Sequence, residues 1–248
     1  MGKSNFKLFI QRKILKNRVT SEELLDNLRK HGADIGKDVL VYSTNRTMID
    51  ASSPFLLKIG DHVRIAEGVK ILTHDYAWSV LKRYSSDTAC EGRIFGAQSA
   101  VEIGSNVFIG MNAIITRGVK IGDNVIIGAG SVVTKDCQAG GVYAGNPAKR
   151  IMTVEEYYRK REALQLKEAK DIAIRYKQRF HREPPIEIFS EYFMLFTTRE
   201  EAQKVPAFRA QMGRMGNMEA TENYMDTHEP SFPDYEAFLK HCYQQEEV

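Results

Sequence analysis

The chain has 248 residues, of which 43% are hydrophobic, and a formal net charge of +3 at pH 7. Such a small charge gives no reason to expect nucleic acid as a partner, and no stretch approaches the roughly 20 apolar residues that span a bilayer. The three cysteines Cys90, Cys137 and Cys242 are an odd number without metal-ligand spacing, which fits a reducing cytoplasm. We expect a cytoplasmic protein with free thiols.

The first residues form a basic, amphipathic segment. Six lysine and arginine residues precede the first acidic residue, with apolar residues between them at near-helical spacing. A helix docked on the protein explains this pattern, and contact with a membrane surface is the minority interpretation. Thr20 or Ser21, followed by Glu22 and Glu23, then predicts a short helix that reaches about Lys30. Residues 1–33 are therefore expected to be an N-terminal helical segment.

Residues 34–151 carry a six-residue repeat. Its aliphatic anchors are Ile59, Ile65, Ile71, Ile103, Ile109, Ile115, Ile121, Ile127 and Val133. The residue after an anchor is usually small, and the third is mostly Gly, Asn or Asp, which tolerate the left-handed backbone of a tight corner. A helix would not keep this period, since six residues drift around a 3.6-residue turn and each glycine costs about 1 kcal/mol. The repeat predicts a β-solenoid of short strands stacked by parallel pairing.

Two fragments connect this repeat to a known family. The sequences VFIGMNAIITRGVKIGDNVIIGAGSVVTKD (107–136) and AGNPAKRI (144–151) resemble the hexapeptide-repeat acyltransferases. The resemblance implies a mainly β fold, a left-handed parallel β-helix in which three hexapeptides make one triangular coil. It also implies a homotrimer that uses acetyl-CoA and requires no metal. The sequence THDYAW (73–78) is similar to the sugar and capsular polysaccharide O-acetyltransferases, a branch related to the galactoside and maltose acetyltransferases.

The repeat is interrupted between Ile71 and Ile103. The distance of 32 residues is not a multiple of six, so residues 72–96 must leave the coil as a loop, and long loops are commonly functional. The loop opens with His74, whose imidazole could take the proton of an attacking hydroxyl, and the resemblance places a catalytic histidine here. His62, in contrast, occupies a corner position of the repeat, so turn chemistry explains it.

Several residues around the loop are candidates for acceptor binding. Asp75, Tyr76 and Trp78 suit a polar, ring-shaped ligand, although Trp78 could equally anchor the loop by packing. The galactoside-type relatives carry an Asn and an Asp before the histidine, which the resemblance transfers to Asn45 and Asp50. Asn45 could also be a simple corner residue.

The residue that orients His74 is open among Asp75, Glu91 and a backbone carbonyl. The repeat places no Ser or Cys beside His74, so we do not expect a covalent acyl-enzyme.

The resemblance also implies a cofactor site in the groove between two subunits. The residues it assigns to acetyl-CoA are Gly110, Met111, Ala129, Thr134, Lys135 and Lys149. The lysines could meet the phosphate charges of the cofactor, or simply be solubilising surface charges. Met111 departs from the pattern, because galactoside-type relatives carry Ser at that position. Assembly is expected on physical grounds as well, because a single solenoid leaves a flat side and open ends.

Residues 152–248 are expected to be a helical extension. Thr153 to Glu156 form a capping box that starts a long helix, which ends before Pro184. Residues 186–196 and 234–243 predict further short helices. The extension could cap a trimer, wall the acceptor site or dock a partner.

These features together predict an acetyl-CoA-dependent O-acetyltransferase that acts on a sugar, such as a unit of a surface or capsular polysaccharide. Another small acceptor, an amino sugar or an antibiotic, is the main alternative. A zinc lyase of the γ-carbonic-anhydrase type and a non-catalytic scaffold share the solenoid and are held as remote alternatives.

Overall fold

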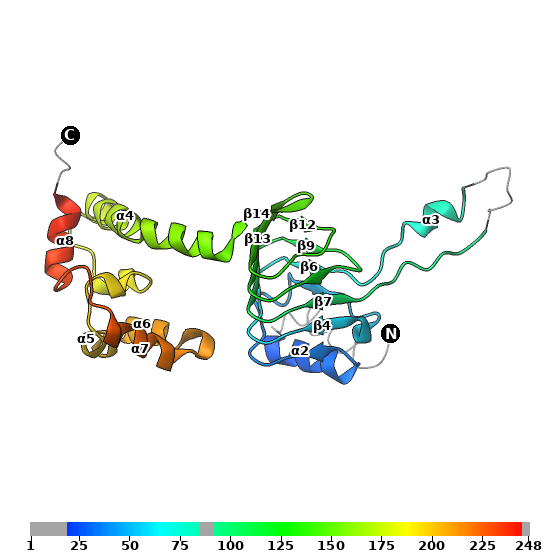
Figure 1. Ribbon diagram of the computed structural model, residues 1–248, viewed down its shortest axis with the longest axis horizontal. Helices are drawn as coiled ribbons and strands as arrows, with labels where there is room; N and C mark the ends of the chain where they lie inside the picture. The colour runs from blue at the N-terminus through cyan, green and yellow to red at the C-terminus, as the bar shows by residue number, and fades with distance from the viewer. Residues whose placement is uncertain (1–18, 85–91, 245–248) are drawn as a thin grey trace. The chain divides into compact units, whose positions relative to one another are not determined.

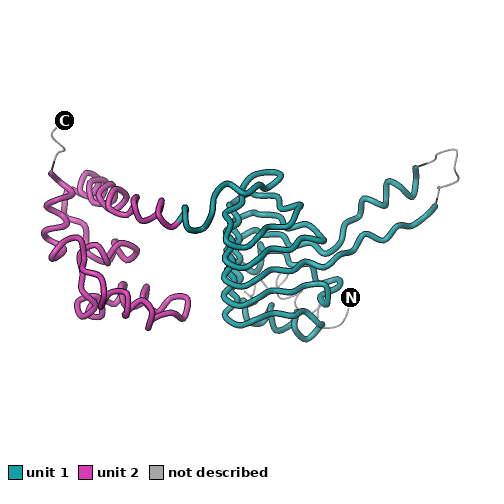
Figure 2. Tube along the Cα trace, in the orientation of Figure 1, with its two compact units in different colours: residues 1–157 teal, residues 158–248 magenta. Residues whose placement is uncertain are grey.

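The computed structural model describes residues 19–84 and 92–244, and the chain divides into two compact units, residues 1–157 and 158–248 (Figures 1 and 2). The basic segment before Val19, Cys90 and Glu91 lie outside the described residues. Within the described ranges, no helix is long and apolar enough to cross a membrane.

Unit 1 begins with helix α2 (Ser21–Lys30), as the sequence predicts. The Thr20 hydroxyl accepts a hydrogen bond from the Glu23 amide, and the Glu23 carboxylate accepts one from the Thr20 amide, which completes a capping box. The helix buries Leu24, Leu25 and Leu28 in the same apolar cluster as the first strands.

The rest of unit 1 is a β-helix of three parallel sheets, which confirms the predicted solenoid (Figure 1). Sheet A contains β1 (Asp34–Ile35), β4 (Leu57–Ile59), β7 (Val101–Ile103) and β10 (Lys120–Ile121). Sheet B contains β2 (Leu40–Val41), β5 (Arg64–Ile65), β8 (Val107–Ile109), β11 (Val125–Ile127), β13 (Gly141–Gly145) and an antiparallel edge strand, β14 (Ala148–Thr153). Sheet C contains β3 (Met48–Ile49), β6 (Lys70–Ile71), β9 (Ile114–Ile115) and β12 (Val132–Val133).

The six-residue anchors form the axis of this β-helix. Ile59 pairs with Ile103 in sheet A, and Ile71 pairs with Ile115 in sheet C. These side chains are at most 1% exposed. Burial of an isoleucine contributes about 1.5–3 kcal/mol, so the stacked anchors are the main source of stability in unit 1.

The sheets meet at three corners, which we call A–B, B–C and C–A after the sheets that they join. Asn106 and Asn124 at the A–B corner and Asn112 at the B–C corner have φ between 55° and 58°. His62 also lies at the A–B corner, with φ 57°, which confirms that it fills a turn position. Left-handed backbone is what Gly and Asn tolerate best, so the third position of the repeat is explained by its conformation.

The interruption of the repeat is a long loop that leaves from the C–A corner. Its two ends pair as an antiparallel stem: the Asp75 amide donates to the Ala97 carbonyl at 3.1 Å, and the Ser99 amide donates to the Thr73 carbonyl at 2.9 Å. The stem therefore continues beyond the expected end at residue 96. The loop carries a short helix, α3 (Trp78–Leu81).

Unit 2 is helical and has a core of its own. The long helix α4 (Val154–Phe180) starts in unit 1 and continues through unit 2. The other elements are η2 (Ile186–Phe189), η3 (Phe193–Leu195), α5 (Arg199–Lys204), α6 (Pro206–Met212), η4 (Arg214–Gly216), α7 (Met218–Thr227) and α8 (Tyr235–Tyr243). Its core is rich in aromatic residues, which include Phe189, Phe196, Phe208 and Phe238.

The helix predicted for residues 234–243 is confirmed as α8, but the one predicted for 186–196 is wrong. That stretch forms two separate 3₁₀ turns, η2 and η3. Neither turn has a side-chain cap, and Tyr192 between them departs from helical geometry, with φ −128° and ψ 3°. So short a segment is not a stable helix by itself, and the packing of Phe189 and Phe196 into the core decides its conformation.

Candidate functional site

His74 lies where the chain leaves sheet C and is paired with a buried carboxylate. Its Nδ1 is 2.5 Å from Oδ2 of Asp50. Asp50 follows β3, one coil before the strand that leads to His74, and its amide donates to the Ile71 carbonyl at 2.9 Å. The Asp50 residue is 8% exposed, whereas the His74 side chain is 32% exposed. One partner is thus fixed in the protein and the other reaches the surface.

The Asp50 carboxylate is surrounded by hydrogen-bond donors. Oδ1 accepts from the Ser52 amide at 3.0 Å and the Ser52 hydroxyl at 2.6 Å. Oδ2 accepts from the Thr73 amide at 3.1 Å and the Thr73 hydroxyl at 2.6 Å. Burial alone would raise the pKa of Asp50, but the bonds from Ser52, Thr73 and His74 outweigh it and hold this pKa well below its usual range.

This environment fixes the role of each nitrogen of the His74 ring. An ionised carboxylate only accepts hydrogen bonds, so Nδ1 must be the donor toward Asp50. In the neutral ring the lone pair is then on Nε2, the nitrogen remote from Asp50. The arrangement can therefore take up a proton at Nε2.

A serine does lie beside His74, which corrects the expectation that none would. The Ser52 hydroxyl oxygen is 3.2 Å from Nδ1 of His74. That hydroxyl donates to Asp50, and Nδ1 already carries a proton, so His74 cannot activate Ser52 as a nucleophile. This contact is not predictable from the repeat, because residues 50–56 interrupt the six-residue period and Ser52 has no defined place in it.

Asp75, the neighbour of His74, points to a different partner. Its Oδ2 accepts from Nε of Arg117 at 2.5 Å, and its Oδ1 accepts from the Ala77 amide at 3.0 Å. The bond from Arg117 is the main reason that the pKa of Asp75 is lowered. Arg117 lies at the C–A corner of the next coil, so this pair ties the start of the loop to the β-helix. The carboxylate that orients His74 is Asp50.

Two aromatic side chains extend the site from His74 along the loop. The ring centroids of Tyr76 and Trp78 are 5.3 Å apart, and the Tyr76 ring meets the His74 ring edge-on at 6.1 Å. Tyr76 is exposed and Trp78 is half-buried. The exposed aromatic surface beside His74 can accept the apolar face of a ring-shaped ligand.

The remaining predicted site residues are distributed over different edges of the β-helix. Thr134 and Lys135 lie at the C–A corner, the corner from which His74 leaves. The B–C corner and the neighbouring end of sheet B hold the others, Asn45, Gly110, Met111, Ala129 and Lys149. Asn45 and Asp50, transferred together from the relatives, are therefore on separate corners. Within a single chain, the predicted residues therefore fall into two groups, one at the C–A corner and one at the B–C corner.

Close stacking of the coils explains one of the small residues at the B–C corner. A Cβ at position 110 would come within 2.6 Å of the Ala129 amide nitrogen, so Gly110 is required by the fold itself. Met111 and Ala129, in contrast, are exposed at this corner and available to a ligand.

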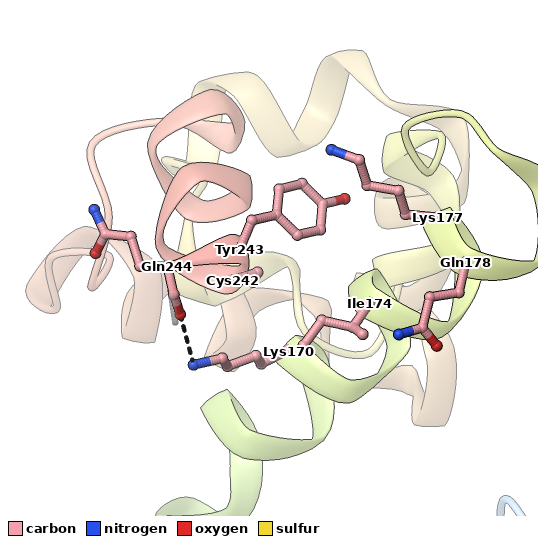
Figure 3. A pocket seen from close by; sticks show the side chains of 7 residues that line it. All are labelled: Lys170, Ile174, Lys177, Gln178, Cys242, Tyr243 and Gln244. Atoms are coloured by element: carbon pink, nitrogen blue, oxygen red, sulfur yellow. Dashed lines mark hydrogen bonds between the residues drawn. The ribbon is translucent and has the colours of Figure 1, made fainter. Parts of the chain in front are cut away.

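Neither described cysteine is suited to nucleophilic chemistry. Burial is the main reason that the pKa of both Cys137 and Cys242 is raised to about 11, so both remain thiols at neutral pH. Cys242 lines a cavity of about 470 Å³ between α4 and α8 in unit 2 (Figure 3). The polar groups there support helix packing: Lys177 lies 3.9 Å above the Tyr243 ring and pairs with Glu183 at 2.6 Å.

The two histidines of the coils do not converge within one chain. His62 pairs with Asp38 at the A–B corner, at 2.9 Å, and His74 pairs with Asp50 at the C–A corner. Across residues 19–84 and 92–244, no three His, Cys, Asp or Glu side chains form a group that could hold a metal ion.

Comparison with known proteins agrees with the coils. A family model described as bacterial transferase hexapeptide (six repeats) matches residues 100–135. Protein CapG of Staphylococcus aureus is 43% identical over 152 residues, which cover 61% of this chain and 80% of the relative. The chain therefore belongs to the hexapeptide-repeat acetyltransferase family.

Solved structures that resemble the chain include two acetyltransferases. A maltose O-acetyltransferase from Clostridium difficile 630 is 29% identical, with 61% of this chain and 86% of that chain covered and a TM-score of 0.40. The hexapeptide-repeat acetyltransferase VCA0836 from Vibrio cholerae O1 biovar eltor, solved with acetyl coenzyme A, is 18% identical, with 60% and 85% covered and a TM-score of 0.40.

Proposed function

We propose that the protein transfers an acetyl group from acetyl-CoA to a hydroxyl of a sugar, such as a unit of a surface polysaccharide, with His74 as the general base. The observation that carries this proposal is the Asp50–His74 pair, which leaves Nε2 of His74 as a proton acceptor at the surface. Family membership supplies the class of reaction.

The chemistry needs one base and no covalent intermediate on the protein. As the acceptor oxygen forms its bond to the thioester carbonyl carbon, its proton moves to Nε2 of His74. Asp50 stabilises the imidazolium that results and keeps its orientation. The carbon–sulfur bond then breaks, and the proton leaves His74 for the thiolate or for water.

The distribution of the site residues supports a trimer with shared sites. His74 and Lys135 lie at the C–A corner, whereas Met111 and Ala129 lie at the B–C corner of the same chain. If the C–A corner of one copy faces the B–C corner of the next, acetyl-CoA can lie in the groove between them, with Lys135 and Lys149 toward its phosphates.

The aromatic pair on the loop supports a sugar as the acceptor. Tyr76 offers an exposed ring beside the base, and Trp78 packs against it at 5.3 Å. Sugar rings have apolar faces that stack on such surfaces and hydroxyls that a neighbouring base can deprotonate.

Matched histidine substitutions test the proposal. Asparagine suits the corner backbone at residue 62, so His62→Asn is the control for His74→Asn. We expect His74→Asn to lower thiol release from acetyl-CoA by at least about 100-fold with neutral sugars as acceptors, because the base is lost, and His62→Asn to remain near wild type. Equal activity of the two variants would refute His74 as the base, and turnover only with amino sugars or an aromatic antibiotic would refute the sugar hydroxyl.

A further inference from the structure

Thr73, the residue before His74, is 1% exposed and makes two bonds to a single oxygen atom. Its amide and its hydroxyl both donate to Oδ2 of Asp50, at 3.1 and 2.6 Å. This is the oxygen that also accepts from Nδ1 of His74. The Thr73 carbonyl accepts from Ser99 and so closes the stem of the loop.

We infer that Thr73 is a positioning residue that acts through Asp50 to fix the ring of His74 and to limit how strongly its proton is held. The inference rests on the proposed role of His74 as the base. The hydrogen bonds of Thr73 go to Asp50 and to the stem of the loop, so it acts on His74 through Asp50 and is not a catalytic residue.

The six-residue repeat does not require a threonine at this position. The equivalent residues in the following coils of sheet C are Arg117 and Lys135, both of which are exposed. A buried hydroxyl without a partner is costly, and this hydroxyl donates to Asp50. The presence of a threonine at residue 73 is therefore explained by its hydrogen bond to Asp50 and not by the geometry of the coil.

The effect on His74 follows from competition for one oxygen. Donors to Oδ2 spread the negative charge of Asp50, and this weakens its attraction for the imidazolium. A base that holds its proton too tightly is charged before the acceptor arrives and is slow to release the proton afterwards. The two hydrogen bonds from Thr73 to Oδ2 are therefore expected to weaken the attraction between Asp50 and the protonated ring of His74.

The other charged and titratable groups near His74 make contacts that do not involve Thr73. Asp75 is paired with Arg117, which offsets its charge. Tyr76 meets the ring edge-on at 6.1 Å. Ser52 donates mainly to Oδ1 of Asp50, the oxygen that does not bind His74. Removing the Thr73 hydroxyl should therefore change the field at His74 through Asp50.

The test compares Thr73→Val, which keeps the shape but removes the hydroxyl, with Thr73→Ser, which keeps the hydroxyl. The His74 ring is followed by ¹⁵N NMR in the full-length, histidine-labelled protein. We expect the titration midpoint of His74 to move upward by about half a pH unit or more in Thr73→Val and to stay at the wild-type value in Thr73→Ser. The acid limb of the kcat/KM profile should move by the same amount, with KM for acetyl-CoA unchanged.

An unmoved midpoint in folded Thr73→Val would overturn the inference. If Thr73→Val does not fold, Thr73→Cys replaces it, because a thiol is a weaker donor of similar size. The midpoint of His74 should then move in the same direction by a smaller amount. An unmoved midpoint in Thr73→Cys would also overturn the inference. The NMR readout needs no acceptor, so it separates two failures. If the midpoint does not move in Thr73→Val but His74→Asn is inactive, only this inference is wrong. If His74→Asn is active, the proposed function is wrong.

Discussion

The residues that the structure describes include two histidine–aspartate pairs of similar geometry, and only one of these pairs has the surroundings of a base. His62 lies 2.9 Å from Asp38, but its side chain is 61% exposed, and Asp38 also binds the guanidinium of Arg64 at 2.6 Å. Asp50 is buried among hydroxyl and amide donors and directs its charge to His74. The charge of Asp38 is shared with an arginine and its histidine is open to solvent, whereas Asp50 is buried and surrounded by donors, so burial and the donor shell distinguish the two pairs.

The largest expected difference between the pairs is in turnover. Asp50→Asn keeps the shape but replaces an oxygen acceptor with an amide that can donate to Nδ1, which would place the ring proton on Nε2, the nitrogen that must act as the base. We expect kcat to fall by at least about 100-fold, by analogy with the buried aspartate of a serine-protease triad.

Asp38→Asn is the matched control and should change kcat by less than about twofold, because Asp38 is a corner residue that touches no part of the site. Thiol release from acetyl-CoA measures both variants, and circular dichroism confirms their fold. Comparable losses in the two variants would mean that the Asp50 pair is no more than a structural contact.

The sequence predicts the position of both histidines, but it does not predict the aspartate that pairs with His74. The six-residue period places His62 at a corner and the exit of the loop next to His74, because each position in the period has one conformation. The role of Asp50 is not predictable in this way, since residues 50–56 break the period and the distance from Asp50 to His74 depends on coil stacking. Only the family resemblance places Asn45 and Asp50 in one site. Strand β3 lies between them, so the two residues are at separate corners.

A mixing experiment tests whether the corner of His74 serves the groove of a neighbouring copy. His74→Asn removes the base, and Ala129→Phe fills the B–C corner, where Ala129 is exposed. Each variant alone should be inactive, but random mixed trimers should recover about one quarter of wild-type activity, since a quarter of the interfaces would join two intact corners. Co-expression, followed by thiol-release assays and light scattering, measures the recovery and the assembly state.

The pair of His62 provides the control for that mixture. Adding His62→Asn to the Ala129→Phe chain, which supplies the intact His74, should leave the recovery unchanged, because the A–B corner contributes nothing to the shared groove. Absence of recovery in a mixture that forms trimers would place the whole site within one chain.

The smallest expected difference is in stability at low pH. The folded-state pKa of both aspartates is lowered, so each binds protons more readily when unfolded, and its stabilising effect is present above about pH 4 and lost as the pH falls toward the folded-state value. For buried Asp50 the free energy of unfolding lost in this way is on the order of 2 kcal/mol. For the more exposed Asp38, solvent screening makes the lost free energy several times smaller. Between roughly pH 5 and pH 2.5, Asp50→Asn should therefore flatten the decline in the free energy of unfolding, and Asp38→Asn should follow the wild type closely. Urea unfolding monitored by fluorescence is suited to this comparison, because the only tryptophan, Trp78, lies in unit 1 with both pairs. An equal decline in wild type and Asp50→Asn would show that the donors around Asp50 do not hold its carboxylate in the ionised form.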